Sequence, residues 1–96
     1  MCKNFKEKLN ECRESIDRLD TVLIFTLGER FKQTNKIGKI KADNKLPTSD
    51  LNREKYQLKR IKKLSKEAKI NSSFAEKLFK IIISEVKSNH EKIKAK

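Results

Sequence analysis

The chain has 96 residues and a formal net charge of +12 at pH 7, from 25 Lys or Arg and 13 Asp or Glu. This length predicts one small domain with a limited core, so oligomerisation is the natural way to bury more apolar surface. Only five basic residues are Arg, and the Lys residues are spread over all segments among the acids, which is typical of a solvated surface and argues against a nucleic-acid-binding protein.

The two cysteines, Cys2 and Cys12, form no metal-ligand pattern with the single His of the chain. We therefore expect a reduced, cytoplasmic protein without a bound metal, in which Cys12 is a small core residue. The sequence has no apolar leader and no run of 18 apolar residues, so it predicts neither secretion nor a membrane span.

A long first helix is predicted over residues 5–41, which contain no Pro. Apolar residues recur there every three or four positions, as expected for one helical face: Leu9, Cys12, Ile16, Leu19, Leu23 and Leu27. Gly28 and Gly38 each cost a helix about 1 kcal/mol relative to Ala, so a break at Gly28 is an alternative. The absence of a turn cluster between residues 29 and 39 favours a continuous helix.

A second helix is predicted from the segment Pro47-Thr48-Ser49-Asp50 to about residue 69, with Ser49 or Asp50 as its N-cap. Its apolar stripe is Leu51, Tyr56, Leu58, Ile61, Leu64 and Ala68. The spacing is looser than in the first helix but still compatible with contact to a core on one side.

A third helix is predicted to open on a capping box, in which Ser73 and Glu76 satisfy each other's backbone amides. Its apolar stripe is Phe74, Leu78, Phe79, Ile82, Ile83 and Val86, and it ends on the polar His90. The sequence therefore predicts a single all-α domain over residues 1–96, with three helices per chain.

The length of the first helix predicts an assembly. At 1.5 Å per residue it would be roughly 55 Å long, whereas a compact domain of this size is about 30 to 35 Å across. The helix must then overhang its own domain, and its apolar stripe needs a second chain. An intertwined antiparallel homodimer with two-fold symmetry is the simplest closed solution.

Five charged residues lie in the predicted helices at positions without an evident packing role: Arg13, Arg30, Lys41, Arg53 and Glu54. Arg30 and Lys41 are separated by about 20° around a helix and by roughly 16 Å along it, which suits the two ends of one small polyanion. Arg13 lies roughly 25 Å from Arg30 along the axis, so it would reach that ligand from the partner in an antiparallel dimer. The alternative is that all three are solvated helix charges.

Glu54 lies in the first turn of the second helix, where the helix dipole favours a carboxylate, but it would also accept a hydrogen bond from a ligand hydroxyl. His90 on an apolar stripe is typical of a partly buried core residue. The sequence shows no Ser-His-Asp set, no Cys-His pair and no Gly-rich phosphate loop. We therefore expect an enzyme whose chemistry does not depend on a conventional nucleophile.

Four segments, in this order and spacing, resemble the all-helical (type II) chorismate mutases, which are small intertwined dimers of three helices per chain: RESIDRLDTVLIFTLGER, IGKIK, PTSDLNRE and KLFKIII. The resemblance covers nearly the whole chain. It implies conversion of chorismate to prephenate in aromatic amino-acid biosynthesis, a unimolecular rearrangement that needs no base, nucleophile, metal or cofactor. Such an enzyme holds the dianion in its reactive conformer and stabilises charge that develops on the ether oxygen.

The resemblance also implies roles for individual residues. Arg13 would enter the partner's active site, Arg30 and Lys41 would bind the substrate carboxylates, and Lys41 would also approach the ether oxygen. The end of the site that holds the ring hydroxyl would be shaped by Asp50, Arg53 and Glu54.

Two positions on the third helix depart from the family pattern. Val86 stands where some members have Ser, and His90 stands where members have Gln or Glu at the ether oxygen. We keep both among the predicted substrate-binding residues and assign catalytic roles to Arg30, Lys41 and His90. Our hypothesis is that His90 donates a hydrogen bond to the ether oxygen, more effectively when the ring is protonated.

Three alternatives to a chorismate mutase remain open from the sequence. An isochorismate pyruvate-lyase would use the same scaffold and cations, and only its products separate it. A basic helical nucleic-acid-binding protein would show affinity that falls steeply with salt. A catalytically silent relative is the third, because of Val86 and His90.

Overall fold

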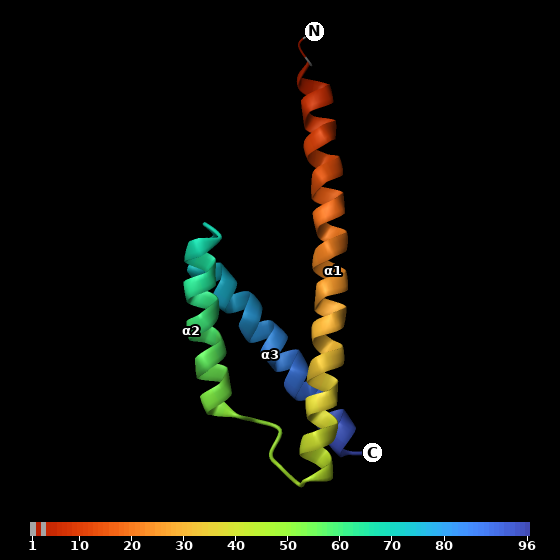
Figure 1. The fold of residues 1–96 in the computed structure, drawn as a ribbon, viewed down its shortest axis with the longest axis vertical. Helices are drawn as coiled ribbons and strands as arrows, with labels where there is room; N and C mark the ends of the chain where they lie inside the picture. Colours follow the sequence, from red (N-terminus) through yellow and green to blue (C-terminus); the bar gives the residue numbers. More distant parts are fainter. Residues whose placement is uncertain (1, 3) are drawn as a thin grey trace. The chain divides into compact units, whose positions relative to one another are not determined.

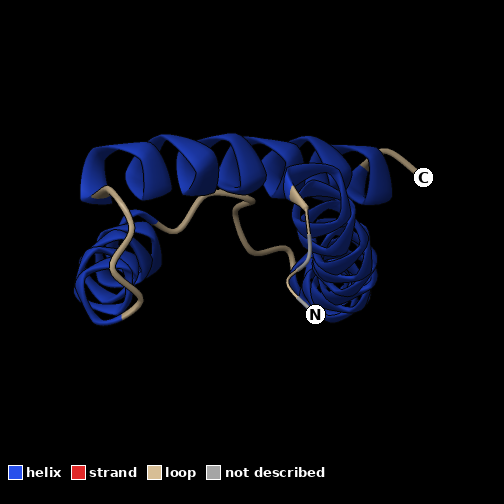
Figure 2. Cartoon of the chain, turned by 90° about the horizontal axis from the view of Figure 1, so that it is seen from above, coloured by secondary structure: helices blue, strands red, loops and turns tan. Residues whose placement is uncertain are grey.

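The computed structural model describes Cys2 and residues 4–96, and regular structure in that part of the chain is helical throughout (Figure 1, Figure 2). Within it the helices are α1 (Phe5–Asp43), α2 (Leu51–Glu67) and α3 (Ser72–Lys94). The predicted all-α class, with three helices and a long first one, is confirmed. None of these helices is long and apolar enough to cross a membrane.

Helix α1 is continuous through both of its glycines (Figure 1) and ends two residues beyond the predicted position. A Cβ added at Gly28 would meet nothing within 4 Å, whereas one at Gly38 would lie 2.7 Å from Cδ2 of His90 and 3.0 Å from Cδ1 of Ile93. Gly38 therefore serves close packing against α3, since a methyl group has no room there, and the alternative of a break at Gly28 is not realised.

The chain divides into two compact units, Met1–Gln33 (the first unit) and Thr34–Lys96 (the second unit). The first unit is helical from Phe5 onward, and none of its described residues is buried. Exposed apolar side chains follow its predicted stripe: Leu9, Ile16, Leu19 and Leu23. Cys12 is also exposed, so its prediction as a core residue is wrong for this chain, because a lone helix offers no second layer to cover it.

The second unit contains the end of α1 together with α2 and α3, and it has a core. Helices α2 and α3 pack against each other (Figure 1). Ala75 and Ile82 of α3 are its buried apolar residues, and Ser65 and His90 are buried polar ones. The Ser65 hydroxyl lies 2.8 Å from the Lys62 carbonyl oxygen, to which it donates, and 2.9 Å from Oγ of Ser72, which joins the end of α2 to the start of α3.

The start of α2 follows the prediction. Asp50 is the N-cap, and its carboxylate accepts a hydrogen bond from the backbone N–H of Arg53 at 3.1 Å. A capping carboxylate satisfies an amide at the helix start and also suits the positive end of the helix dipole. Asp50 is thus held at the first turn by the backbone that it caps.

The start of α3 differs from the prediction. The N-cap is Asn71, whose side-chain oxygen accepts from the backbone N–H of Phe74 at 3.0 Å, and the helix begins at Ser72. The predicted capping box of Ser73 and Glu76 is therefore wrong. Asn is as strong a cap as Ser, so two competing caps stand within three residues, and the earlier one begins the helix.

The predicted apolar stripes of α2 and α3 are covered only in part. On α2 the half-buried members are Leu58 and Ile61, and the others are exposed: Leu51, Tyr56, Leu64 and Ala68. On α3 the exposed members are Phe74 and Leu78. Periodicity identifies the apolar face of a helix, but it does not say how much of that face another element covers.

Candidate active site

The predicted site residues are divided between the two units. Arg13 and Arg30 belong to the first unit, where Arg13 is exposed and Arg30 is half-buried. The second unit contains the other six: Lys41, Asp50, Arg53, Glu54, Val86 and His90. The second unit therefore carries most of the predicted site within one compact body.

Lys41 is half-buried in the last turn of α1. Its ammonium donates to the backbone carbonyl of Thr48 at 3.3 Å, and the Thr48 hydroxyl donates to Oε1 of Glu91 at 2.6 Å. These bonds hold the loop between α1 and α2 against the last turns of α3. An ammonium carries three N–H donors, so Lys41 keeps donors for an anion while its position is fixed by the loop.

Arg53 lies exposed in the first turn of α2, and its guanidinium carbon is 5.0 Å from the centroid of the Tyr56 ring. This distance is within the range of a cation–π contact, which favours an Arg over the face of an aromatic ring. Tyr56 was predicted as part of the apolar stripe of α2, but it is 55% exposed. Its ring serves instead as a support for the Arg53 side chain.

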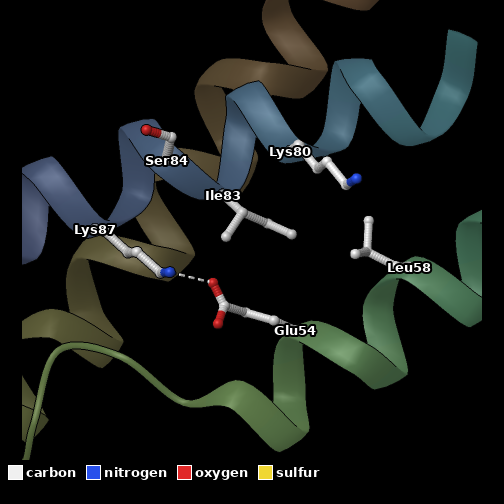
Figure 3. Close-up of a pocket in the computed structure, with 6 residues that line it drawn as sticks. All are labelled: Glu54, Leu58, Lys80, Ile83, Ser84 and Lys87. Atoms are coloured by element: carbon white, nitrogen blue, oxygen red, sulfur yellow. Dashed lines mark ion pairs between the residues drawn. The ribbon is translucent and has the colours of Figure 1, made fainter.

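Glu54 lines a cavity of about 320 Å³ between α2 and α3 (Figure 3). Its Oε1 forms an ion pair with the ammonium of Lys87 at 2.5 Å. The remaining lining residues are Leu58, Lys80, Ile83 and Ser84. The cavity combines an apolar floor with a carboxylate, a hydroxyl and two ammonium groups, which suits a small polar ligand with an apolar ring.

Sequence reasoning did not find Lys80, Ser84 and Lys87 as residues of this cavity. Their spacings of four and three place them on one face of α3, which was the available signal. The signal was weak because Lys is abundant along the whole chain, so a lysine of the cavity cannot be distinguished from a surface lysine by its spacing.

His90 is buried, with 3% of its surface exposed, and its Nε2 lies 2.8 Å from the backbone carbonyl oxygen of Thr34. A carbonyl oxygen only accepts hydrogen bonds, so this contact places a proton on Nε2. Nδ1 is buried without a hydrogen-bond partner among the described residues. In the neutral ring Nδ1 is an acceptor, and it becomes a donor only when the ring is protonated.

The described residues contain no group of three or more His, Cys, Asp and Glu side chains that would hold a metal ion. What the second unit does offer is a half-buried ammonium at Lys41, a carboxylate at Glu54 and an imidazole at His90. An ammonium group attracts anions, and a carboxylate accepts hydrogen bonds from hydroxyl groups.

Comparison with known proteins places the chain in one family. The family described as "Chorismate mutase type II" matches residues 12–91, a range that contains all eight predicted site residues. Over 82 residues the chain is 35% identical to "Chorismate mutase" of Methanocaldococcus jannaschii, which covers 85% of this chain and 83% of that protein.

Longer relatives contain the same region. The chain is 31% identical over 80 residues to "Bifunctional chorismate mutase/prephenate dehydratase" of Buchnera aphidicola subsp. Schizaphis graminum, covering 83% of this chain and 21% of that protein. It is 39% identical over 61 residues to the protein of the same description in Aquifex aeolicus, covering 64% of this chain and 17% of that protein. The chain thus spans about a fifth of these bifunctional relatives. The match over residues 12–91, on a scaffold of three helices, shows that the chain belongs to the type II chorismate mutase family.

Proposed function

We propose that this chain is a chorismate mutase that acts as a cytoplasmic homodimer and converts chorismate to prephenate. The observation that carries the proposal is the family match over residues 12–91, which spans every predicted site residue. It is supported by the similarity to a chorismate mutase from M. jannaschii over most of both chains. The reaction is a unimolecular rearrangement, so the protein has to bind, orient and stabilise one dianion.

The cations bind the two carboxylates of the substrate. Arg30 and Lys41 of one chain grip the dianion, and Arg13 comes from the partner chain. Lys41 suits this role because the Thr48 carbonyl fixes its ammonium, so less side-chain freedom is lost on binding. The high positive charge of the chain would also attract the dianion from solution.

The breaking ether bond is stabilised by Lys41 and His90. Because Nε2 of His90 already donates to Thr34, the donor toward the ether oxygen is Nδ1 of the protonated ring. A donor that points at developing negative charge stabilises the transition state more than the ground state. Val86, which is half-buried on the same helix, supplies an apolar wall at a position where a Ser would supply a hydroxyl.

The ring hydroxyl of the substrate is held near the start of α2. Glu54 accepts its hydrogen bond, Asp50 fixes the first turn of the helix as its cap, and Arg53 lies beside them in the same turn. A carboxylate that accepts from a neutral hydroxyl makes a charge-assisted hydrogen bond, which is stronger than a neutral one.

The homodimer is proposed from the first unit. Its predicted apolar stripe includes Leu19, which is 66% exposed, and Leu23, which is 54% exposed. A stripe of exposed apolar side chains along one face of a helix suits contact with another chain. A second copy of α1 in antiparallel orientation would cover it and would also bring Arg13 to the partner's site.

Incubation of the purified protein with chorismate, with prephenate as the measured product, tests the proposal. We expect turnover by the wild type and a loss of about 100-fold or more in Arg30→Ala, because one fixed cation is removed from the transition state. A protein that forms no prephenate at any pH between 5 and 8 would contradict the proposal. Release of pyruvate from isochorismate, without prephenate formation, would favour a lyase on the same scaffold.

A further inference from the structure

The ion pair between Lys87 and Glu54 joins α3 to α2 at the edge of the cavity shown in Figure 3. The Lys87 side chain is 38% exposed and that of Glu54 is 18% exposed, and Nζ is 2.5 Å from Oε1. Lys80 also lines the cavity, but among the residues drawn in Figure 3 the ion pair is made by Lys87. One of the two lysines of this cavity therefore has a specific partner.

We infer that Lys87 is a positioning residue for Glu54, and that it fixes the carboxylate so that Oε2 accepts the hydroxyl of the substrate. This inference rests on the proposed function, and it assigns to Lys87 a role that the predicted site did not include. An ion pair that is still partly exposed to solvent contributes little to stability. Its main effect is then on the orientation of the carboxylate.

The surroundings of Glu54 support this role. Leu58 and Ile83 form the apolar floor of the cavity and offer no donor to the carboxylate. Lys87 occupies Oε1, which leaves Oε2 to receive a second donor, because a carboxylate has about four acceptor positions on two oxygens. Without Lys87 the carboxylate would be free to rotate toward solvent, and the substrate hydroxyl would meet it in several orientations.

The orientation of the Glu54 carboxylate also affects which substrates are accepted. A carboxylate held in one orientation favours a ligand whose hydroxyl donor arrives at Oε2. A dianion that lacks this hydroxyl would leave Oε2 of the half-buried carboxylate without a donor, and such mismatches discriminate more strongly than a lost apolar contact. Lys87 would thus contribute to the choice of a hydroxylated substrate although it contacts the substrate only through Glu54.

Steady-state kinetics with chorismate test the inference in four variants. Lys87→Met removes the ammonium and keeps the length of the side chain, Lys87→Arg keeps the charge, and Glu54→Gln removes the carboxylate. Lys92→Met is the matched control, because Lys92 is an exposed lysine of the same helix. We expect about a tenfold loss of kcat/KM in Lys87→Met, as for a charged hydrogen bond, and about twofold or less in Lys92→Met and Lys87→Arg.

The double variant Glu54→Gln/Lys87→Met separates positioning from a general structural effect. If Lys87 acts through Glu54, adding Lys87→Met to Glu54→Gln changes kcat/KM by about twofold or less, because coupled residues are not additive. A full tenfold loss in the Glu54→Gln background would overturn the inference, as would equal kcat/KM in Lys87→Met and wild type. A wild type without turnover would overturn the proposed function and this inference together, whereas the other outcomes concern Lys87 alone.

Discussion

The two units of the chain differ in how far their apolar side chains are buried. In the second unit α2 and α3 pack together, and Ala75 and Ile82 of α3 are buried. The first unit is one helix from Phe5 onward, and no described residue in it is buried, although its apolar residues are regularly spaced. Regular apolar spacing without a covering layer is a feature of helices that associate with another chain.

This contrast separates two kinds of site residue. Lys41 and Glu54 are held by partners within the second unit, a backbone carbonyl for one and an ammonium for the other. Arg13 is exposed on a helix whose apolar neighbours are themselves exposed. We therefore expect the second unit to fix its site residues without help, and Arg13 to become fixed only when a partner chain binds.

The largest effect is expected from a charge on the apolar stripe of the first unit. Leu19→Asp should dissociate the dimer, because an unpaired carboxylate would be buried in an apolar interface, at a cost of about 2 kcal/mol or more. Sedimentation should then show monomers, and prephenate formation should be lost. Asn10→Asp adds the same charge at an exposed polar position of the same helix, and it should leave both the dimer and the activity intact.

Mixing two inactive variants tests whether Arg13 acts across the dimer. Arg13→Ala and Arg30→Ala should each lose about 100-fold or more in turnover. After the two are unfolded and refolded together, half of the dimers are mixed, and each mixed dimer has one complete site. Activity should then return to about a quarter of the wild-type value. Unchanged low activity in the mixture would place Arg13 in the same site as Arg30 of its own chain.

The two glycines of α1 provide a matched pair between the units. Gly38→Ala should destabilise the protein by about 1 to 3 kcal/mol, because its Cβ would lie 2.7 Å from the His90 ring. Gly28→Ala should stabilise the helix by up to about 1 kcal/mol, since nothing lies within 4 Å. Urea unfolding measures both. A destabilised Gly28→Ala variant would indicate that a second chain packs closely against Gly28.

The pH dependence of turnover tests the donor proposed for His90. A histidine ring normally changes its charge between pH 5 and 8, and only the charged ring has a proton on Nδ1 as well as on Nε2. If the charged ring is the donor, the wild-type kcat/KM should be higher at pH 5 than at pH 8. His90→Gln should remove this slope. A flat profile in both proteins would contradict a charged donor.

The smallest effect is expected at Ser65, inside the core of the second unit. Ser65→Ala should cost about 1 kcal/mol of unfolding free energy, because it removes the hydroxyl that joins α2 to α3. Ser88→Ala, at an exposed position of α3, should change stability by less than about 0.5 kcal/mol. Equal values for the two variants would show that the Ser65 contact adds nothing to the packing of the helices.

Much of the fold could be predicted because it depends on local rules. The continuous α1 follows from apolar spacing without a turn cluster, and the start of α2 follows from a strong cap at Asp50. The N-cap of α3 was harder to predict, because Asn71 and Ser73 are both good N-caps and their capping preferences differ little. The exposure of Cys12 was missed because periodicity cannot say which face finds a covering layer within the chain.

The contacts of the predicted site residues could not be predicted from the sequence. His90 lies against Gly38 and Thr34, which are more than 50 positions away along the chain. A local sequence pattern does not predict such a contact. Lys87 was missed for a different reason. Its partner Glu54 belongs to another helix, and in a chain with 25 basic residues one further lysine carries little information.

The short connection between Glu67 and Ser72 has a consequence for the kinetics of folding. Helices α2 and α3 are neighbours along the chain, so their pairing closes a small loop and costs little chain entropy. We expect this hairpin to form in a fast phase whose rate does not depend on protein concentration. Association of chains through α1 would follow as a slower, bimolecular phase, so catalytic activity would return later than helical structure after dilution from urea.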